Sequence, residues 1–249
     1  MKNIINYIFI GFIQGITEFL PVSSSGHIVL FGSLFELENL LLLSVVAHIG
    51  TLFAVLFCYR GKLMELVKKP INKTNLHLLI ATIPTVLIVV FFNDLIEKYF
   101  GMNFLIWGFL ISAVLLAVAD FKSTGKKSIN KKNSLIMGVS QGLAILPGIS
   151  RSGTTLCFGL LSGVEKKEAL DFSFLMSIPI IFASAVYESF DIIHSQLSVN
   201  WLGIFVVMVT SFIFGILSIK IMLKLVNKNK LFYFSFYLII LSLIILLFL

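Results

Sequence analysis

The sequence predicts an all-α polytopic membrane protein with six transmembrane helices and two re-entrant broken-helix segments, arranged as an inverted-topology repeat. The composition is the first reason: 58% of the 249 residues are hydrophobic and 12% are charged, a balance typical of chains that lie in lipid. The second reason is a series of long apolar runs. The third is a polar segment that interrupts the apolar sequence twice, at matching positions in the two halves.

Six apolar runs approach the roughly 20 residues that a helix needs to cross the hydrocarbon core of a bilayer. They cover residues 41–59, 76–93, 104–120, 170–187, 200–220 and 231–249. Two further apolar segments, 1–40 and 133–162, are each broken in the middle by polar residues. The longest polar stretches, 60–75 and 120–133, are connectors, so we expect a single membrane domain over residues 1–249.

The two polar interruptions correspond to each other. The first runs from Gln14 to His27 and the second from Gln141 to Thr154, and adding 127 carries Gln14 to Gln141. The same shift moves the first three apolar runs onto the last three. The chain is therefore predicted to consist of two repeats, residues 1–122 and 123–249.

Lysine and arginine gather in alternate connectors, and this predicts the orientation in the membrane. They stand at Arg60, Lys62, Lys68, Lys69, Lys73, Lys122, Lys126, Lys127, Lys131, Lys132, Lys166, Lys167, Lys220, Lys224, Lys228 and Lys230. The positive-inside rule places these connectors in the cytoplasm. The net charge of +7 comes largely from them, so it does not indicate a nucleic-acid partner.

This orientation makes the two halves inverted relative to each other. Segment 133–162 then begins and ends on the cytoplasmic side, whereas segment 1–40 approaches from the outer side. In inverted repeats of this kind, broken helices from the two halves meet near the bilayer midplane and form the binding site. We therefore expect the two polar interruptions to meet there.

Glu18 and Arg151 are the charged residues of the two interruptions. A carboxylate at membrane depth costs about 2.5–3.5 kcal/mol even on lenient scales, and it indicates a functional site. Gln14 and Glu18 are four residues apart and share one face of a helix. A divalent cation or a basic partner would compensate the charge of Glu18. The alternative is a structural salt bridge between Glu18 and Arg151 with no further role.

Each interruption continues as a turn rich in serine and glycine, followed by an apolar helix. Serine before a helix is typical of an N-cap, and a helix N-terminus favours an anion such as phosphate. The candidate substrate-binding residues are Ser23, Ser25, Gly26, Ser150, Ser152, Gly153, Thr154 and Thr155. The alternative for Ser23 and Ser150 is that they only cap their helices.

Ser24 and His27 are three residues apart, on adjacent helical turns, and are candidates for a nucleophile and its base. Arg151 would bind phosphate oxygens through its planar guanidinium group. His48 lies in the first apolar run, and we interpret it as a core histidine whose hydrogen bonds are satisfied.

These motifs resemble the undecaprenyl-diphosphatase family of bacterial integral membrane enzymes, the bacitracin-resistance type. The resemblance covers essentially the full length and depends on residues 14–27, 146–155 and 171–179. It implies hydrolysis of undecaprenyl diphosphate, a prenyl diphosphate lipid, to undecaprenyl phosphate and inorganic phosphate. This reaction recycles the lipid carrier of cell-wall synthesis and confers bacitracin resistance. The resemblance also implies a homodimer in the bacterial plasma membrane, with its site open to the outer side.

By the same resemblance, Glu18, Ser24, His27 and Arg151 are catalytic, and either Ser24 or His27 attacks phosphorus. A divalent cation, Mg²⁺ or Ca²⁺, is implied as the cofactor, held by Glu18 and Gln14. Many relatives carry Glu where this chain has Gln14. An amide oxygen can still bind a metal, but it adds no charge and cannot act as a base.

The alternative function is that of a transporter or flippase for an anionic prenyl-phosphate lipid. Inverted repeats with broken helices at the midplane are also a transporter plan. Ser24 and His27 distinguish the two hypotheses, because transport does not need a nucleophile.

Overall fold

A computed structural model describes residues 2–34, 39–92, 102–122, 125–194, 200–228 and 230–248, and most of them are helical. The helices in these ranges are α1 (Lys2–Phe19), α2 (Ser24–Leu34), α3 (Leu40–Cys58), α4 (Arg60–Lys68), α5 (Lys73–Phe91), α7 (Met102–Lys122), α8 (Lys131–Leu143), α9 (Arg151–Leu161), α10 (Lys166–His194), α11 (Trp201–Asn227) and α12 (Phe232–Phe248). Within the same ranges the extended structure is limited to one isolated bridge, between Lys127 and Val164. The all-α prediction is therefore confirmed for the described residues.

In the described part of the chain, five helices are long and apolar enough to cross a membrane. They are α3, α5, α7, α10 and α11, and they coincide with the first five predicted runs. The sixth run coincides with α12, which is shorter at 17 residues. The end of the second run and most of the connector after it, residues 93–101, lie outside the described residues. These helices make the chain a multi-pass membrane protein.

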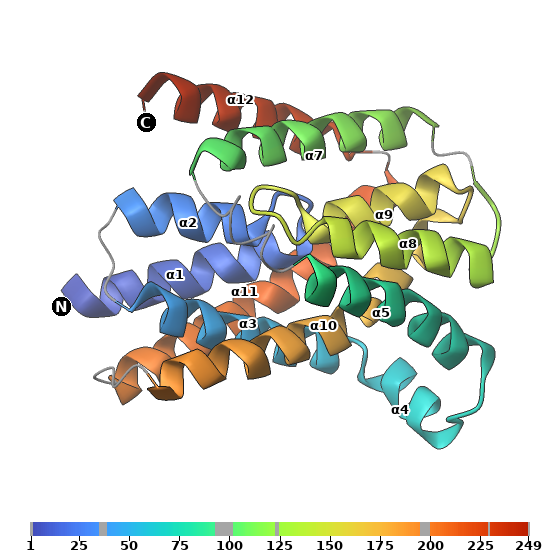
Figure 1. Cartoon of the computed structure of the whole chain (residues 1–249), viewed down its shortest axis with the longest axis horizontal. Helices are drawn as coiled ribbons and strands as arrows, with labels where there is room; N and C mark the ends of the chain where they lie inside the picture. Colours follow the sequence, from blue (N-terminus) through green and yellow to red (C-terminus); the bar gives the residue numbers. More distant parts are fainter. Residues whose placement is uncertain are drawn as a thin grey trace.

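Both polar interruptions break a helix, as predicted. The first separates α1 from α2 and the second separates α8 from α9. Figure 1 shows each pair folded back as a hairpin, with α1 and α2 at the left and α8 and α9 at the right. The tips of the two hairpins face each other in the middle of the molecule.

The long helices run roughly along the long axis of the molecule, so the connectors collect at its two ends. The short helix α4 and the connections from α7 to α8, from α9 to α10 and from α11 to α12 lie at the right-hand end in Figure 1. Most of the lysines lie in these connectors and in the helix turns next to them. The C-terminal end of α10 and the start of α11 lie at the opposite end.

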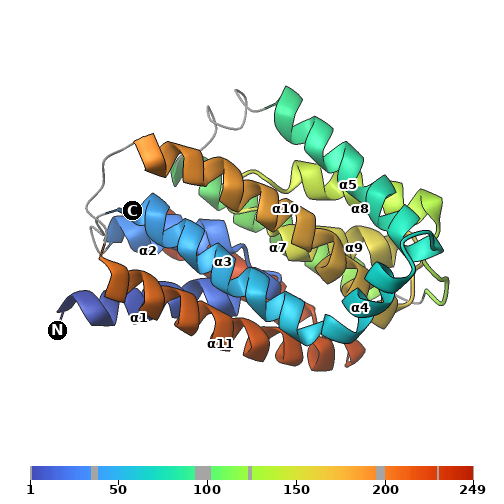
Figure 2. The ribbon, with the colours of Figure 1, turned by 90° about the horizontal axis from the view of Figure 1, so that it is seen from below.

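Helix α11 holds α1 and α3 in place by packing against both of them, and Figure 2 shows α3, α10 and α11 side by side. The contact with α1 is close: a Cβ added at Gly15 would stand 2.8 Å from the carbonyl oxygen of Ser211. Ser218 Oγ also donates a hydrogen bond to the Gly15 carbonyl oxygen at 2.8 Å. Small residues permit such close helix contacts in lipid. The contact fixes the end of α1 that carries Glu18 beside α3.

Candidate active site

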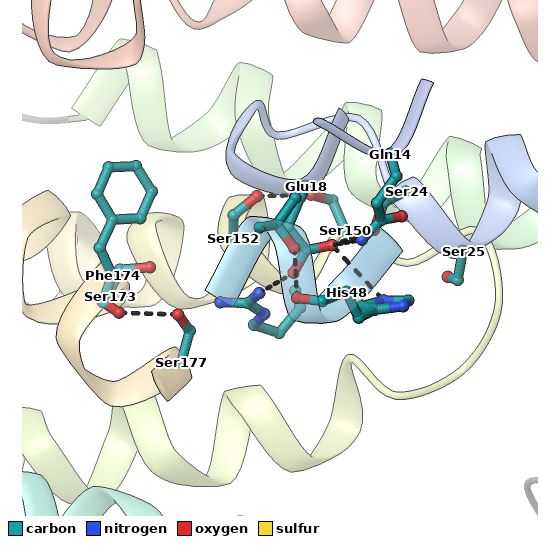
Figure 3. A network of polar contacts seen from close by, with 12 residues as sticks. Gln14, Glu18, Ser24, Ser25, His48, Ser150, Ser152, Ser173, Phe174 and Ser177 are labelled. Carbon is teal, nitrogen blue, oxygen red and sulfur yellow. Dashed lines mark hydrogen bonds and ion pairs between the residues drawn. The ribbon is translucent and has the colours of Figure 1, made fainter. Parts of the chain in front are cut away.

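Glu18 is the centre of a polar network between the tips of the two hairpins (Figure 3). It lies in the last turn of α1 and is 6% exposed. Its Oε2 accepts hydrogen bonds from Gln14 Nε2 at 2.9 Å and from Ser24 Oγ at 2.5 Å. Its Oε1 forms an ion pair with Arg151 Nη2. The structure thus brings together four of the predicted site residues, from both hairpins.

His48 of α3 also belongs to this network, although the sequence did not place it there. Its Nε2 lies 3.8 Å from Glu18 Oε2, and its Nδ1 lies 2.8 Å from the carbonyl oxygen of Ser44. The interpretation of His48 as a satisfied core histidine therefore accounts for only one of its two ring nitrogens. A titratable side chain inside an apolar run was the signal that could have indicated it.

His27 lies near Ser24 in sequence, but its ring engages other partners. Its Nδ1 is 2.7 Å from the carbonyl oxygen of Ser23, and its Nε2 is 2.6 Å from the hydroxyl of Tyr237 in α12. Because a carbonyl oxygen only accepts, Nδ1 donates there and Nε2 accepts from Tyr237. Ser24 instead donates to Glu18. The predicted pairing of Ser24 with His27 is therefore not formed in this conformation.

The serines at the starts of α2 and α9 act as helix caps. Ser150 is the N-cap of α9, and its Oγ accepts from the backbone N–H of Gly153 at 3.1 Å. Ser23 Oγ accepts from the backbone N–H of Gly26 at 3.3 Å. The capping alternative thus accounts for the hydroxyls of Ser23 and Ser150.

The remaining predicted substrate-binding residues differ in what they contact. Ser25 Oγ lies 3.4 Å from Ser23 Oγ. Ser152 Oγ donates to the carbonyl oxygen of Leu20 at 3.0 Å and so ties the two hairpin tips together. Thr155 Oγ1 donates to the carbonyl oxygen of Arg151 at 2.9 Å, within α9. Ser152 and Thr155 therefore stabilise the backbone around the site.

Helix α7 supports the turn that precedes Arg151. The backbone N–H of Ser150 donates to Ser112 Oγ of α7 at 2.9 Å. Gly148 in this turn has φ +84, and a Cβ there would stand 2.5 Å from the carbonyl oxygen of Leu105. Only glycine fits such a left-handed position pressed against a backbone. The position of Arg151 thus depends on close contact between the turn and α7.

Two polar atoms in the network are buried and have no hydrogen-bond partner among the described residues: Gln14 Oε1 and Arg151 Nη1. Buried polar groups are nearly always paired, so an unpaired acceptor and an unpaired donor in one network call for an explanation. Arg151 Nη1 could donate to an anionic oxygen. Gln14 Oε1 could accept from a ligand or bind a cation.

The residues fit a cation that shares its ligands with a substrate. Within the described ranges no three His, Cys, Asp or Glu side chains form a group that could hold a metal ion. Glu18 and the unpaired oxygen of Gln14 nevertheless supply two oxygen donors. Mg²⁺ is commonly held by one or two carboxylates together with substrate phosphates and water. A carboxylate and an amide are therefore a sufficient protein contribution.

Taken together, the helices and the network define a multi-pass membrane protein with a buried site suited to phosphoryl transfer. The chain belongs to the family described as bacitracin resistance protein BacA, whose model matches residues 7–244. It is 36% identical over 252 residues to an undecaprenyl-diphosphatase from Carboxydothermus hydrogenoformans, covering 98% of this chain and 97% of that protein. It is 38% identical over 250 residues to one from Thermosipho africanus, covering 96% and 98%.

Proposed function

We propose that this protein hydrolyses undecaprenyl diphosphate to undecaprenyl phosphate and inorganic phosphate, and that this activity confers bacitracin resistance. The observation that carries the proposal is the hydroxyl of Ser24, which donates to Glu18 Oε2 at 2.5 Å beside the guanidinium of Arg151. Membership of the family and the names of the relatives support it.

The geometry supports Ser24 as the attacking group. Its Oγ would form a bond to the terminal phosphorus while Glu18 Oε2 takes its proton, and the bond from that phosphorus to the oxygen of the prenyl phosphate would break. Water would then hydrolyse the phosphoserine and release phosphate. Arg151 Nη1, buried and unpaired among the described residues, would donate to an oxygen of the transferring group. Positioning and charge stabilisation of this kind dominate phosphoryl transfer.

The sequence predicts that His27 is catalytic. For His27 to attack phosphorus, its ring would have to leave the hydroxyl of Tyr237, which lies 2.6 Å from Nε2. In the described conformation its contribution is to hold the carbonyl oxygen of Ser23, directly before Ser24. His27 would therefore act as a positioning residue for the nucleophile.

Glu18 and Gln14 would hold the divalent cation, for which the sequence predicts Mg²⁺ or Ca²⁺. When bound, such an ion offsets the negative charge of the diphosphate. Gln14 would orient its unpaired Oε1 toward the ion, while its Nε2 keeps the hydrogen bond to Glu18 Oε2 at 2.9 Å.

The proposed setting is the bacterial plasma membrane, with six transmembrane helices, two re-entrant hairpins and inverted repeats over residues 1–122 and 123–249. The hairpins that meet tip to tip and the lysine-rich connectors at one end support this arrangement (Figure 1). An opening of the site toward the outer side, which the resemblance to the family implies, is part of the proposal. A homodimer is part of the proposal, and light scattering of the detergent-solubilised protein would test it.

The direct test is phosphate release from a C55 prenyl diphosphate by the purified protein, with and without a chelator. Ser24→Ala should lower turnover by at least about a thousandfold, because the nucleophile is removed. Ser184→Ala removes a hydroxyl that bonds Glu188, in α10, and should leave turnover unchanged. Near-normal turnover in Ser24→Ala would refute the mechanism.

Transport of a prenyl phosphate lipid is the competing function. The relatives are named as diphosphatases, and the described residues offer no feature that favours transport over hydrolysis. The hydrogen bond of Ser24 to Glu18 serves a nucleophile and is not needed for transport. Lipid movement in proteoliposomes without phosphate release by the wild type would favour the transporter.

A further inference from the structure

The ring of His48 lies beside the carboxylate of Glu18, but no hydrogen bond joins His48 Nε2 to Glu18 Oε2. Its Nδ1 lies 2.8 Å from the carbonyl oxygen of Ser44. Because the carbonyl oxygen only accepts, Nδ1 carries the hydrogen, and in the neutral ring Nε2 presents a lone pair. That lone pair stands 3.8 Å from Glu18 Oε2, which is also an acceptor. With the ring neutral, two acceptors face each other beside Glu18, and a cation between them would satisfy both.

The separation fits a metal ion better than a shared proton. A direct N–H···O hydrogen bond has its heavy atoms about 2.7–3.2 Å apart, whereas His48 Nε2 and Glu18 Oε2 are 3.8 Å apart. Bonds from a transition metal to imidazole nitrogen and to carboxylate oxygen are each about 2.0–2.2 Å long. One ion can therefore bridge up to about 4.2 Å, and 3.8 Å lies within that reach.

A second observation points to a ligand at the same carboxylate. Gln14 is fully buried at 0% exposure, and its Oε1 has no partner among the described residues. Its Nε2 donates to the same Glu18 Oε2 at 2.9 Å, so the unpaired oxygen belongs to a side chain that already contacts this carboxylate. Histidines that bind metals also commonly donate their other ring N–H to a carbonyl or carboxylate, as His48 does to Ser44.

We propose that His48 Nε2 is a ligand of the cation at Glu18, with Gln14 Oε1 as the third protein donor. This inference rests on the proposed function only in taking a cation to be part of the site. It also specifies the class of cation. Mg²⁺ and Ca²⁺ prefer oxygen ligands throughout, whereas imidazole suits Zn²⁺ and the other later transition metals. The site should therefore bind a transition-metal ion such as Zn²⁺ more tightly than Ca²⁺.

The test uses Mn²⁺ as the probe and the full chain purified in detergent. Pulsed electron paramagnetic resonance should show coupling of bound Mn²⁺ to a nitrogen nucleus in the wild type. Labelling the histidines with ¹⁵N should replace the coupling to ¹⁴N by a coupling to ¹⁵N. This change identifies a histidine ligand without any substitution. In His48→Gln the coupling should disappear, and the affinity for Mn²⁺ should fall at least about tenfold.

Two matched variants serve as controls. His27→Gln removes the buried histidine of α2, whose ring bonds Ser23 and Tyr237, and should keep the nitrogen coupling. His77→Gln removes a histidine near the start of α5 and should also keep it. Size-exclusion elution and thermal unfolding establish that each variant is folded.

Three results would overturn the inference: no Mn²⁺ binding by the wild type, no histidine coupling of bound Mn²⁺, or coupling that persists in His48→Gln. Its failure is distinct from failure of the proposed function. If the protein releases phosphate but bound Mn²⁺ shows no nitrogen coupling, His48 is not a ligand and the proposed hydrolase function stands. If the coupling is present but no phosphate is released, the metal site stands and the proposed hydrolase function is wrong.

Discussion

Glu18 and Arg151 pose the main question at the scale of single residues, because their ion pair is compatible with a purely structural role. Their side chains are 5% and 16% exposed, so both charges are largely withdrawn from solvent. Removing one partner of a buried pair strands the other charge and costs about 3–5 kcal/mol. A single inactive variant therefore does not separate catalysis from folding.

A double variant separates the two roles. Glu18→Gln and Arg151→Gln should each lower the thermal unfolding temperature, whereas Glu18→Gln with Arg151→Gln should recover most of the loss because no charge is stranded. The double variant should nevertheless release no phosphate, since it has neither the proton acceptor nor the guanidinium. Unfolding curves and phosphate release measure both effects. A stable and active double variant would establish the structural salt bridge as the whole role of the pair.

Arg151→Lys tests whether the planar shape of the guanidinium group matters in addition to its positive charge. Arg151 Nη2 pairs with Glu18, while Nη1 is left unpaired among the described residues. An ammonium group lacks the planar fork that would hold the carboxylate and a phosphate oxygen at the same time. We expect kcat/KM to fall at least about tenfold with little change in unfolding temperature. Arg60→Lys, at the exposed start of α4, is the control.

The sequence predicted the residues that share a repeat motif and missed those that reach the site from elsewhere. Gln14, Glu18 and Arg151 were predictable because polar side chains at membrane depth are energetically costly and therefore indicate a functional site. His48 and Tyr237 come from helices whose contacts with the hairpin tips depend on helix packing, which local sequence does not specify. The predicted pairing of Ser24 with His27 is not formed in the described conformation for the same reason: Tyr237, from α12, engages the ring of His27.

At the scale of elements, the lengths of the helices were predicted less well than their existence. Residues 60–75 were interpreted as a connector, but Arg60–Lys68 forms α4. Its Arg, Lys, Leu, Met and Glu residues are good helix formers, and a polar helix is stable outside the hydrocarbon. Helices α10 and α11 likewise extend past the predicted apolar runs, because helices can continue into the interface.

The turn before α9 should be the element most sensitive to a small substitution. Gly148→Ala would place a Cβ 2.5 Å from the carbonyl oxygen of Leu105 at a φ of +84. The left-handed conformation alone costs about 1–2 kcal/mol for other residues, and the overlap adds to it. We expect a lower unfolding temperature and weaker phosphate release, because the turn sets the start of the helix that carries Arg151.

Gly61→Ala is the matched control for this substitution. A Cβ at Gly61, in α4, would have no atom within 4 Å. Replacing glycine by alanine inside a helix stabilises it by about 0.5–1 kcal/mol. Equal behaviour of the two variants in thermal unfolding would show that the turn does not depend on its glycine.

At the scale of the whole molecule, the lysine pattern and the hairpins that meet tip to tip together predict on which side of the membrane each helix end lies. Helix α11 has 27 residues, which at about 1.5 Å per residue gives about 40 Å, longer than the hydrocarbon core of about 30 Å. Its two ends should therefore lie on opposite sides of the membrane. The hairpin of α8 and α9, in contrast, should begin and end on the same side.

Accessibility of single cysteines tests both statements in intact cells. In a background with Cys58→Ala and Cys157→Ala, Trp201→Cys should react with a membrane-impermeant thiol reagent, whereas Lys228→Cys should react only after the cells are opened. These positions lie at the two ends of α11. The difference follows from the positive-inside rule, which keeps the lysine-rich end in the cytoplasm.

The hairpin of α8 and α9 decides whether the second repeat is re-entrant. Lys132→Cys stands at the start of α8, and Lys167→Cys stands just after α9, at the start of α10. If the hairpin turns back at the midplane, both should be protected in intact cells and both should react after lysis. Protection of one with labelling of the other would mean that the segment crosses the bilayer. Arg151 would then belong to a continuous span, and the inverted arrangement that brings it to Glu18 would be wrong.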